Sequence, residues 1–204
     1  LAKPAAHPAA RPRAARAHAH HRRAAQRPAP RPHAEHAHAV LLATIAHHAR
    51  PLGDDVLIGW LLDGGHQFRT GSDAEVIVHL YEEYGARFAE RLIGMFALAI
   101  WDPAAKQLFL ARDRLGKKPL YYAVRHGCLY FASELKGLLA HPNFQKGLDI
   151  DPRALSDYLS FGYILTPKSF YRNIHRLPAA HFALFAPDTG ELRTREYWRL
   201  EDFF

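Results

Sequence analysis

The stretch Ser72–Trp101, SDAEVIVHLYEEYGARFAERLIGMFALAIW, decides the fold class of this chain. Its first half predicts a helix, because its apolar residues recur with the spacing of one buried helical face; they are Val76, Ile77, Leu80, Tyr81 and Tyr84. Ser72 with Glu75 three residues later is typical of a capping box, and Gly85 suits the left-handed conformation that ends a helix. After Gly85 the spacing of the apolar residues changes. Met95–Trp101 is a continuous apolar run that predicts a strand covered on both faces.

The segments after Trp101 predict a meander of short antiparallel strands and two further helices. Strands are expected at Leu108–Ala111, Pro119–Val124 and Cys128–Ala132, and more strands between Phe170 and Trp198. Helices are expected at Ser133–His141, with Ser133 as the cap, and from Asp151-Pro152 to Gly162. Buried strands with amphipathic helices outside them predict a layered α+β sandwich.

The first fifty of the 204 residues differ in composition from the rest. Ala, His, Arg and Pro make up 41 of them, whereas all 24 aromatic residues and all 13 glycines come later. They hold nine Lys+Arg and one acid, which gives them a net charge of +8. The remaining 154 residues have a net charge of −1, so the whole chain has a net charge of +7. So few large apolar groups cannot offset the entropy of ordering the chain. We therefore predict a disordered low-complexity segment at 1–60 and the folded domain at 61–204.

Composition also excludes several classes of protein. The single cysteine, Cys128, rules out an internal disulfide and fits a reducing compartment, so a cytoplasmic location is expected. No apolar run approaches the ~18–20 residues of a membrane span, and the first residues lack the apolar core of a secretory signal. We therefore expect no membrane association.

Two segments contain candidate binding residues. Asp73 is either an ordinary acid at a helix start or a carboxylate that holds the ammonium group of a ligand. The basic turn Arg112–Lys118, RDRLGKK, either cradles an anion or is a solvated turn in which Asp113 pairs with an arginine. Residue spacing alone favours the structural interpretation of both segments.

Cysteine and histidine residues give two weaker candidates. Cys128 follows His126 by two residues in a predicted strand, but a small structural cysteine, buried or half-buried, is the favoured interpretation. Histidines of the basic segment could collect a divalent metal; they are His33, His36, His38, His47 and His48. A defined metal site needs ligands that a fold holds in place, so no metal site is assigned there.

Five strings occur in an order that resembles one known family. They are GHQFRTGSDAEVIVHLYEEYG, LIGMFALAIWD, ARDRLGKKPLYY, FASELKGLL and LDIDPRALSDYLSFGYI. Together they resemble the class II, N-terminal-nucleophile glutamine amidotransferase domain of glutamine-hydrolysing asparagine synthetases, from about Leu61 to Leu200. Related amidotransferases of polysaccharide biosynthesis share these strings. The resemblance implies a four-layer αββα sandwich whose first part is missing or replaced.

The resemblance also implies a substrate and a partner. Such domains hydrolyse glutamine, and the ammonia passes to a synthetase domain that activates aspartate with ATP and Mg²⁺. The family's Ser-Asp-x-Glu segment matches Ser72, Asp73 and Glu75, which implies that Asp73 binds glutamine. The family's nucleophile is an N-terminal cysteine, and no cysteine precedes Cys128. Its Asn-Gly-Glu oxyanion segment is not recognisable either, so we assign no catalytic residue and expect this partial domain to be inactive alone.

The first 60 residues admit two explanations. Their composition is typical of a GC-rich gene read out of frame, and we hypothesise a frameshifted or mis-started translation joined to a genuine domain near Leu61. Alternatively, the chain is a non-catalytic interaction module whose basic, histidine-rich arm binds nucleic acid or anionic surfaces. The arm has no aromatic residues for base stacking, so nucleic acid is not the favoured partner.

Overall fold

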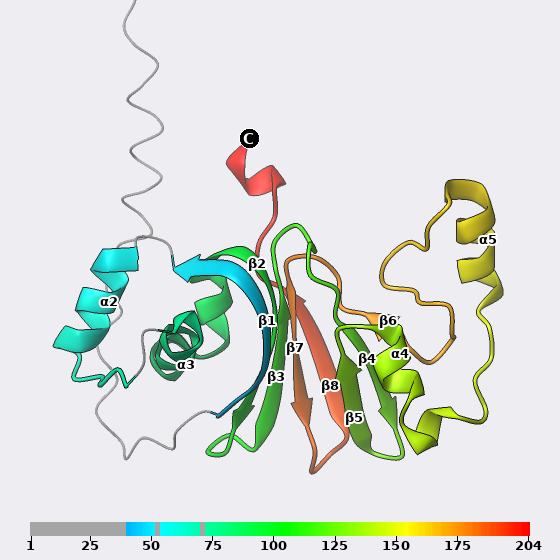
Figure 1. Ribbon diagram of the computed structural model, residues 1–204, viewed down its shortest axis with the longest axis horizontal. Helices are drawn as coiled ribbons and strands as arrows, with labels where there is room; N and C mark the ends of the chain where they lie inside the picture. The colour runs from blue at the N-terminus through cyan, green and yellow to red at the C-terminus, as the bar shows by residue number, and fades with distance from the viewer. Residues whose placement is uncertain (1–39, 52–53, 70–71) are drawn as a thin grey trace, which may run out of the picture. The chain divides into compact units, whose positions relative to one another are not determined.

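The computed structural model describes residues 40–51, 54–69 and 72–204, which form two antiparallel sheets with helices outside them (Figure 1). In spatial order, the larger sheet contains β1 (Val40–Pro51), β2 (Leu92–Asp102), β3 (Gln107–Arg112), β7 (His181–Ala186) and β8 (Glu191–Glu196). The smaller sheet contains β5 (Cys128–Ala132), β4 (Tyr121–Arg125) and β6 (His175–Arg176). The α-helices are α2 (Asp54–Asp63), α3 (Asp73–Tyr84), α4 (Leu135–Leu139) and α5 (Pro152–Phe161). The described residues also form the 3₁₀ helices η2 (Gly85–Arg91), η3 (Pro142–Phe144) and η4 (Glu201–Phe203).

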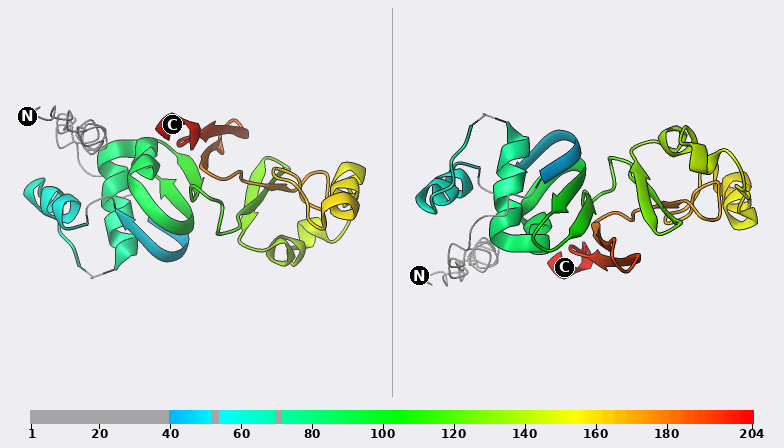
Figure 2. Two further views of the ribbon diagram at one scale, coloured as in Figure 1. Left: turned by 90° about the horizontal axis from the view of Figure 1, so that it is seen from above. Right: turned by 90° about the horizontal axis from the view of Figure 1, so that it is seen from below.

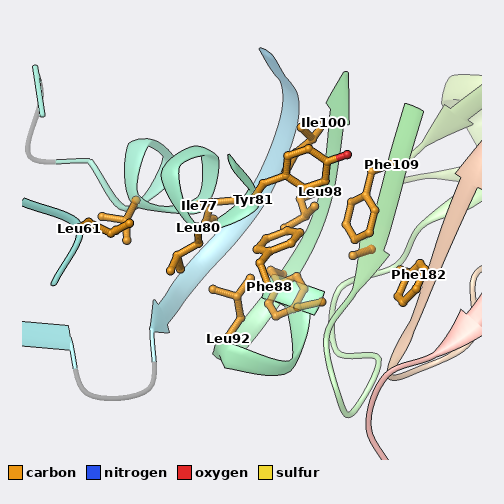
Figure 3. Close-up of a cluster of buried hydrophobic side chains, with 14 residues drawn as sticks. Leu61, Ile77, Leu80, Tyr81, Phe88, Leu92, Leu98, Ile100, Phe109 and Phe182 are labelled. Carbon is orange, nitrogen blue, oxygen red and sulfur yellow. The ribbon is translucent and has the colours of Figure 1, made fainter. Parts of the chain in front are cut away.

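Helix α3 covers one face of the larger sheet (Figure 2). Its apolar face packs with η2 against alternate residues of β2 and β3, and Figure 3 shows this cluster. Aromatic rings lie at its centre: the centroids of Phe88 and Phe109 are 5.2 Å apart, and those of Phe109 and Phe182 are 5.4 Å apart. Burial of this face explains the apolar spacing that predicts α3 from the sequence.

The opposite face of the larger sheet packs against the smaller sheet. The residues between the sheets come from β2, β3, β4 and β7 and from the segment before β7; they include Ala99, Leu110, Tyr122, Leu177 and Phe185. On the outer face of the smaller sheet, Leu138 of α4 and Phe144 of η3 pack with Ala123 and Ile174. The order is therefore helix, sheet, sheet, helix, and both the α+β class and the four-layer αββα sandwich are confirmed.

Most of the predicted elements are present with the predicted ends. Ser72 is the N-cap of α3, and Gly85 follows its last residue with φ +55°, but the ψ of Gly85 is −144°, so the predicted left-handed helical conformation is wrong. Asp151 caps α5 through its side chain, and Gly162 ends that helix in the left-handed conformation. The cap of α4 was wrong: Glu134 occupies that position instead of Ser133, because the strand before it continues to Ala132.

Ordered structure begins earlier than the sequence predicts. We expected disorder through residue 60, but Val40–Pro51 forms β1, which pairs antiparallel with β2, and Asp54–Asp63 forms α2. The apolar run VLLATI at 40–45 was hidden by the average composition of the first fifty residues, and pairing with the edge of β2 gives its backbone hydrogen-bond partners. Residues 1–39, including His33, His36 and His38, lie outside the described residues.

Candidate functional site

Asp73 is the first residue of α3, at the corner where a loop turns into the helix. Ser72 precedes it in extended conformation, and its Oγ accepts a hydrogen bond from the Ala74 amide at 3.2 Å. The Glu75 amide donates to the Ser72 carbonyl at 3.0 Å. The side chain of Asp73 lies outside the described parts of the chain, so the structure places this predicted residue by its backbone.

Side chains of α3 hold the loop that leads to Asp73. Glu75 Oε1 accepts a hydrogen bond from the Arg69 amide at 2.6 Å. Earlier in the loop, the ring of His66 contacts Glu83 Oε1 through Nε2 at 2.8 Å. The His66 amide also donates to the Leu61 carbonyl at 3.1 Å. The loop is therefore held by hydrogen bonds to α2 at His66 and to α3 at His66 and Arg69, and these contacts fix where α3 begins.

The basic turn after β3 is built around the buried guanidinium of Arg112. It donates to three backbone carbonyls, those of Lys118 at 2.6 Å, Leu177 at 2.7 Å and Gly116 at 2.6 Å. Burial lowers the pKa of Arg112 below its usual range, although the carboxylate of Asp113 opposes this shift. Because its donors are directed at the protein's own backbone, Arg112 is not available to an external anion.

Asp113 is also occupied by the backbone. Its side chain is buried and accepts amide hydrogen bonds from Leu115 at 3.2 Å, Lys117 at 2.9 Å and Lys118 at 2.9 Å. Its own amide donates to the Phe96 carbonyl at 2.9 Å, which ties the turn to β2. The prediction of a solvated turn with an Asp113–arginine pair is therefore wrong, because Asp113 and Arg112 are both buried and each is paired with backbone groups.

Cys128 lies in a different layer from Asp73. It is exposed and begins β5 in the smaller sheet, directly after a hairpin turn in which His126 and Gly127 have φ +52° and +74°. Helix α3, which Asp73 begins, covers the far face of the larger sheet. The prediction of a buried or half-buried cysteine is wrong, and the fold does not bring this thiol to the N-terminus of α3.

Sequence reasoning missed a cluster of histidines and glutamates beside the loop. His66 and His79 approach through their Nδ1 atoms at 3.0 Å, and His79 Nδ1 lies 3.1 Å from Glu82 Oε2. The local signal was the spacing of His79 and Glu82 by three residues on one helical face. His66 comes thirteen residues earlier and joins them through the loop, which spacing could not show.

Similarity to known proteins agrees with these motifs. A family model described as a glutamine amidotransferase domain matches residues 58–198, which is more than half of the chain. The chain belongs to the glutamine amidotransferase domain family. The resemblance drawn from the five strings is therefore confirmed.

The curated relatives of this amidotransferase domain are mostly named as asparagine synthetases. Asparagine synthetase [glutamine-hydrolyzing] 2 of Bacillus subtilis is 44% identical over 141 residues, which is 67% of this chain and 19% of the relative. A putative asparagine synthetase of Methanocaldococcus jannaschii is 39% identical over 134 residues, covering 66% of this chain and 26% of the relative. The chain thus spans about a fifth to a quarter of the length of these relatives.

Among solved structures, the domain is similar to glutamine phosphoribosylpyrophosphate amidotransferase from B. subtilis. The sequence identity is 17% and the TM-score is 0.49, with 78% of this chain and 29% of that chain covered. Of the helices that the structure describes, none has the length and apolar content needed to cross a membrane.

Proposed function

We propose that this chain supplies part of the glutaminase domain of a glutamine-hydrolysing asparagine synthase. The observation that supports this most directly is the position of Asp73 at the N-terminus of α3, inside the matched range 58–198. In the parent reaction, glutamine and water give glutamate and ammonia, and the ammonia passes to aspartate that ATP and Mg²⁺ have activated. We place that second half of the reaction in a synthetase domain or subunit, and the whole assembly in the cytoplasm.

In this proposal, Asp73 holds the α-ammonium group of glutamine. A carboxylate and an ammonium form a charge-assisted hydrogen bond, which orients the substrate as well as binding it. The fastened loop supports this role, because the Ser72 cap and the Glu75–Arg69 contact fix the backbone on both sides of Asp73. Rigid backbone lowers the entropic cost of holding the substrate in one orientation.

The thiol that attacks glutamine is not supplied by Cys128. A nucleophilic cysteine needs a neighbouring base and must reach the bound substrate. Cys128 is exposed on the smaller sheet, whereas α3 covers the larger one. The 204 residues by themselves therefore bind glutamine without turning it over.

Two measurements test these statements. Calorimetric titration with glutamine is expected to show binding that Asp73→Asn weakens at least tenfold, whereas Asp188→Asn, in an exposed turn, leaves it unchanged. Absence of glutamine binding by the wild-type chain, or equal binding by the two variants, would contradict the role of Asp73. Release of ammonia from glutamine that disappears in Cys128→Ser would show that the assignment of Cys128 is wrong.

Helix α5 offers a surface for the synthetase part. Its side chains Leu155, Tyr158, Leu159 and Phe161 are all exposed, and Leu159 has an exposed fraction of 77%. Contiguous apolar surface of this kind marks interaction sites. We assign it to the synthetase because the relatives are four to five times longer than their match to this chain.

A pull-down with the synthetase segment of the B. subtilis relative tests this surface. We expect capture by the wild-type chain and a loss of at least tenfold with Leu159→Ser/Phe161→Ser. Leu115→Ser is the matched control, because Leu115 is 67% exposed in the basic turn. Equal capture by all three chains would place the synthetase contact elsewhere.

A further inference from the structure

Three side chains at the loop before Asp73 bring their ligand atoms close together. His66 Nδ1 and His79 Nδ1 are 3.0 Å apart, His79 Nδ1 and Glu82 Oε2 are 3.1 Å apart, and His66 Nδ1 and Glu82 Oε2 are 3.6 Å apart. The exposed fractions of these side chains are 6%, 16% and 11%. Two imidazoles and a carboxylate therefore converge in a partly enclosed site.

The triangle formed by these atoms has the size of one face of a metal-coordination tetrahedron. Zinc binds histidine nitrogen and carboxylate oxygen at about 2.0–2.2 Å, which separates the ligand atoms of a tetrahedral site by about 3.4 Å. The three measured separations of 3.0, 3.1 and 3.6 Å average close to that value. One point lies about 2.1 Å from every one of the three atoms, slightly out of their plane, and leaves a fourth position for water.

His66 has the outer carboxylate partner that metal-bound histidines use, and His79 has a carboxylate nearby. A ligating imidazole donates its other N–H to a carboxylate, which fixes its tautomer. His66 Nε2 lies 2.8 Å from Glu83 Oε1, so the proton belongs on Nε2 and the lone pair of Nδ1 faces the centre of the triangle. His79 Nε2 lies 4.0 Å from Glu75 Oε1. Both histidines thus present Nδ1 inward and Nε2 toward a glutamate.

The tautomer of His79 distinguishes a site with metal from one without. Its Nε2 is buried and has no hydrogen-bond partner among the described residues. Without a cation, the proton of His79 belongs on Nδ1, where it bridges to Glu82, and the lone pair of Nε2 then faces the Glu75 carboxylate. When a cation binds at Nδ1, the proton of His79 moves to Nε2. The interaction between Nε2 and the Glu75 carboxylate then changes from repulsion between two lone pairs to attraction between an N–H and a carboxylate.

We propose that His66, His79 and Glu82 bind a divalent transition-metal ion of the zinc class. The bound ion joins the loop residue His66 to two residues of α3, and Glu75 links the same cluster to the Arg69 amide. The ion therefore holds the loop that leads to Asp73, as a structural rather than a catalytic metal. Imidazole nitrogen with one carboxylate oxygen favours zinc over calcium or magnesium, which prefer oxygen ligands.

Cobalt(II) is the probe of choice, because tetrahedral cobalt absorbs visible light where octahedral cobalt is almost colourless. The full chain is titrated with CoCl₂ in parallel with His79→Gln, Glu82→Gln, Glu83→Gln and the control His126→Gln, whose site is an exposed turn. Circular dichroism shows first that each variant is folded. The histidines of the basic segment are present in all five proteins, so their binding cancels in the comparison.

We expect one cobalt equivalent with tetrahedral absorption in the wild type and the control, displaced by zinc. His79→Gln and Glu82→Gln are expected to lose at least 100-fold in affinity for that equivalent, and Glu83→Gln 10- to 100-fold, because Glu83 orients His66. The metal should raise Tm in the wild type and leave the Tm of His79→Gln unchanged. Equal cobalt binding and equal absorption in the wild type and His79→Gln would overturn the proposal. In that case the cluster is a hydrogen-bond network in which His66 donates to Glu83 and His79 donates to Glu82.

Discussion

The carboxylate of Asp113 offers the sharpest test of how the basic turn is held. The variants Asp113→Ala and Asp113→Asn differ in how many backbone amides lose their acceptor. In the wild type, Oδ1 accepts from Leu115 and Lys117 at 3.2 and 2.9 Å, and Oδ2 accepts from Lys118 at 2.9 Å. Alanine removes all three acceptors, whereas asparagine keeps Oδ1 and turns an amide NH₂ toward the Lys118 amide.

These contacts set the expected loss of stability. A hydrogen bond to a charged group contributes about 1.5–3 kcal/mol, and water reaches part of this turn because Leu115 is exposed, so the lower half of that range applies. The three bonds together then contribute about 4.5–7 kcal/mol, so Asp113→Ala should lower the free energy of unfolding by about that amount, and Asp113→Asn, which loses the bond to Lys118 only, by about 1.5–2 kcal/mol. In a chain of this length, about 1 kcal/mol shifts Tm by about 2–4 °C, so the alanine variant should melt roughly 9 to 28 °C lower.

Urea unfolding followed by tyrosine and tryptophan fluorescence measures both losses. Asp188→Asn is the matched control, because Asp188 lies in an exposed turn, and it should stay within about 0.5 kcal/mol of the wild type. An alanine variant as stable as this control would refute the account of the turn. So would an asparagine variant that is less stable than the alanine variant, since the two share the loss at Lys118 only.

Four further predictions concern the turn, a buried phenol and the first part of the chain. Gly116→Ala should lower stability by about 1–3 kcal/mol in thermal melts, because Gly116 has φ +63° and a Cβ there would lie 3.1 Å from Arg112 Cζ. Burial raises the pKa of Tyr197 in the folded state. The contribution of its neutral phenol to stability is therefore complete below the unfolded pKa of about 10 and is lost as the pH rises from there through the folded pKa. Tyr197→Phe should reduce this loss of stability at alkaline pH, measured by urea unfolding at a series of pH values. Sequencing the encoding DNA should give a Cys-Gly start and an Asn-Gly-Glu segment in another frame upstream of Leu61, and the frameshift hypothesis fails if neither frame does. A basic binding arm instead predicts DNA affinity that falls steeply with salt and disappears on deletion of residues 1–50, and salt-independent binding would exclude it.

Patterns that are local in sequence predicted the fold well. The apolar face of α3 and the caps at Ser72 and Asp151 depend on neighbours within a few residues, so spacing suffices to find them. Long-range pairing was less accessible. The strand β1 was missed because the average composition of fifty residues outweighed one run of six apolar and small residues, and because its partner β2 begins more than forty residues later.

In the candidate site, too, local patterns could be read from the sequence and long-range contacts could not. Asp73 could be proposed from the sequence because it belongs to a string of adjacent residues, and its role stays a prediction. The contacts of the loop before it could not be predicted, because they join residues 6 to 17 positions apart through a turn. The prediction for Cys128 failed because strand periodicity does not state which strand lies at an edge. Cys128 begins the edge strand β5, where its side chain is open to solvent.

The basic turn and the histidine cluster together show why charge density alone does not identify a binding site. Arg112 belongs to a turn with four cations in seven residues, yet its donors are used by carbonyls, one of them on Leu177, 65 residues away. The histidine cluster has a far weaker signal in the sequence, but the lone pairs of His66 and Glu82 meet at the Nδ1 of His79. Side chains can bind an ion when several of their ligand atoms lie close together and are directed at one another rather than at the protein's own backbone. By that criterion the cluster beside α3, and not the basic turn, is the place in this domain to search for a bound ion.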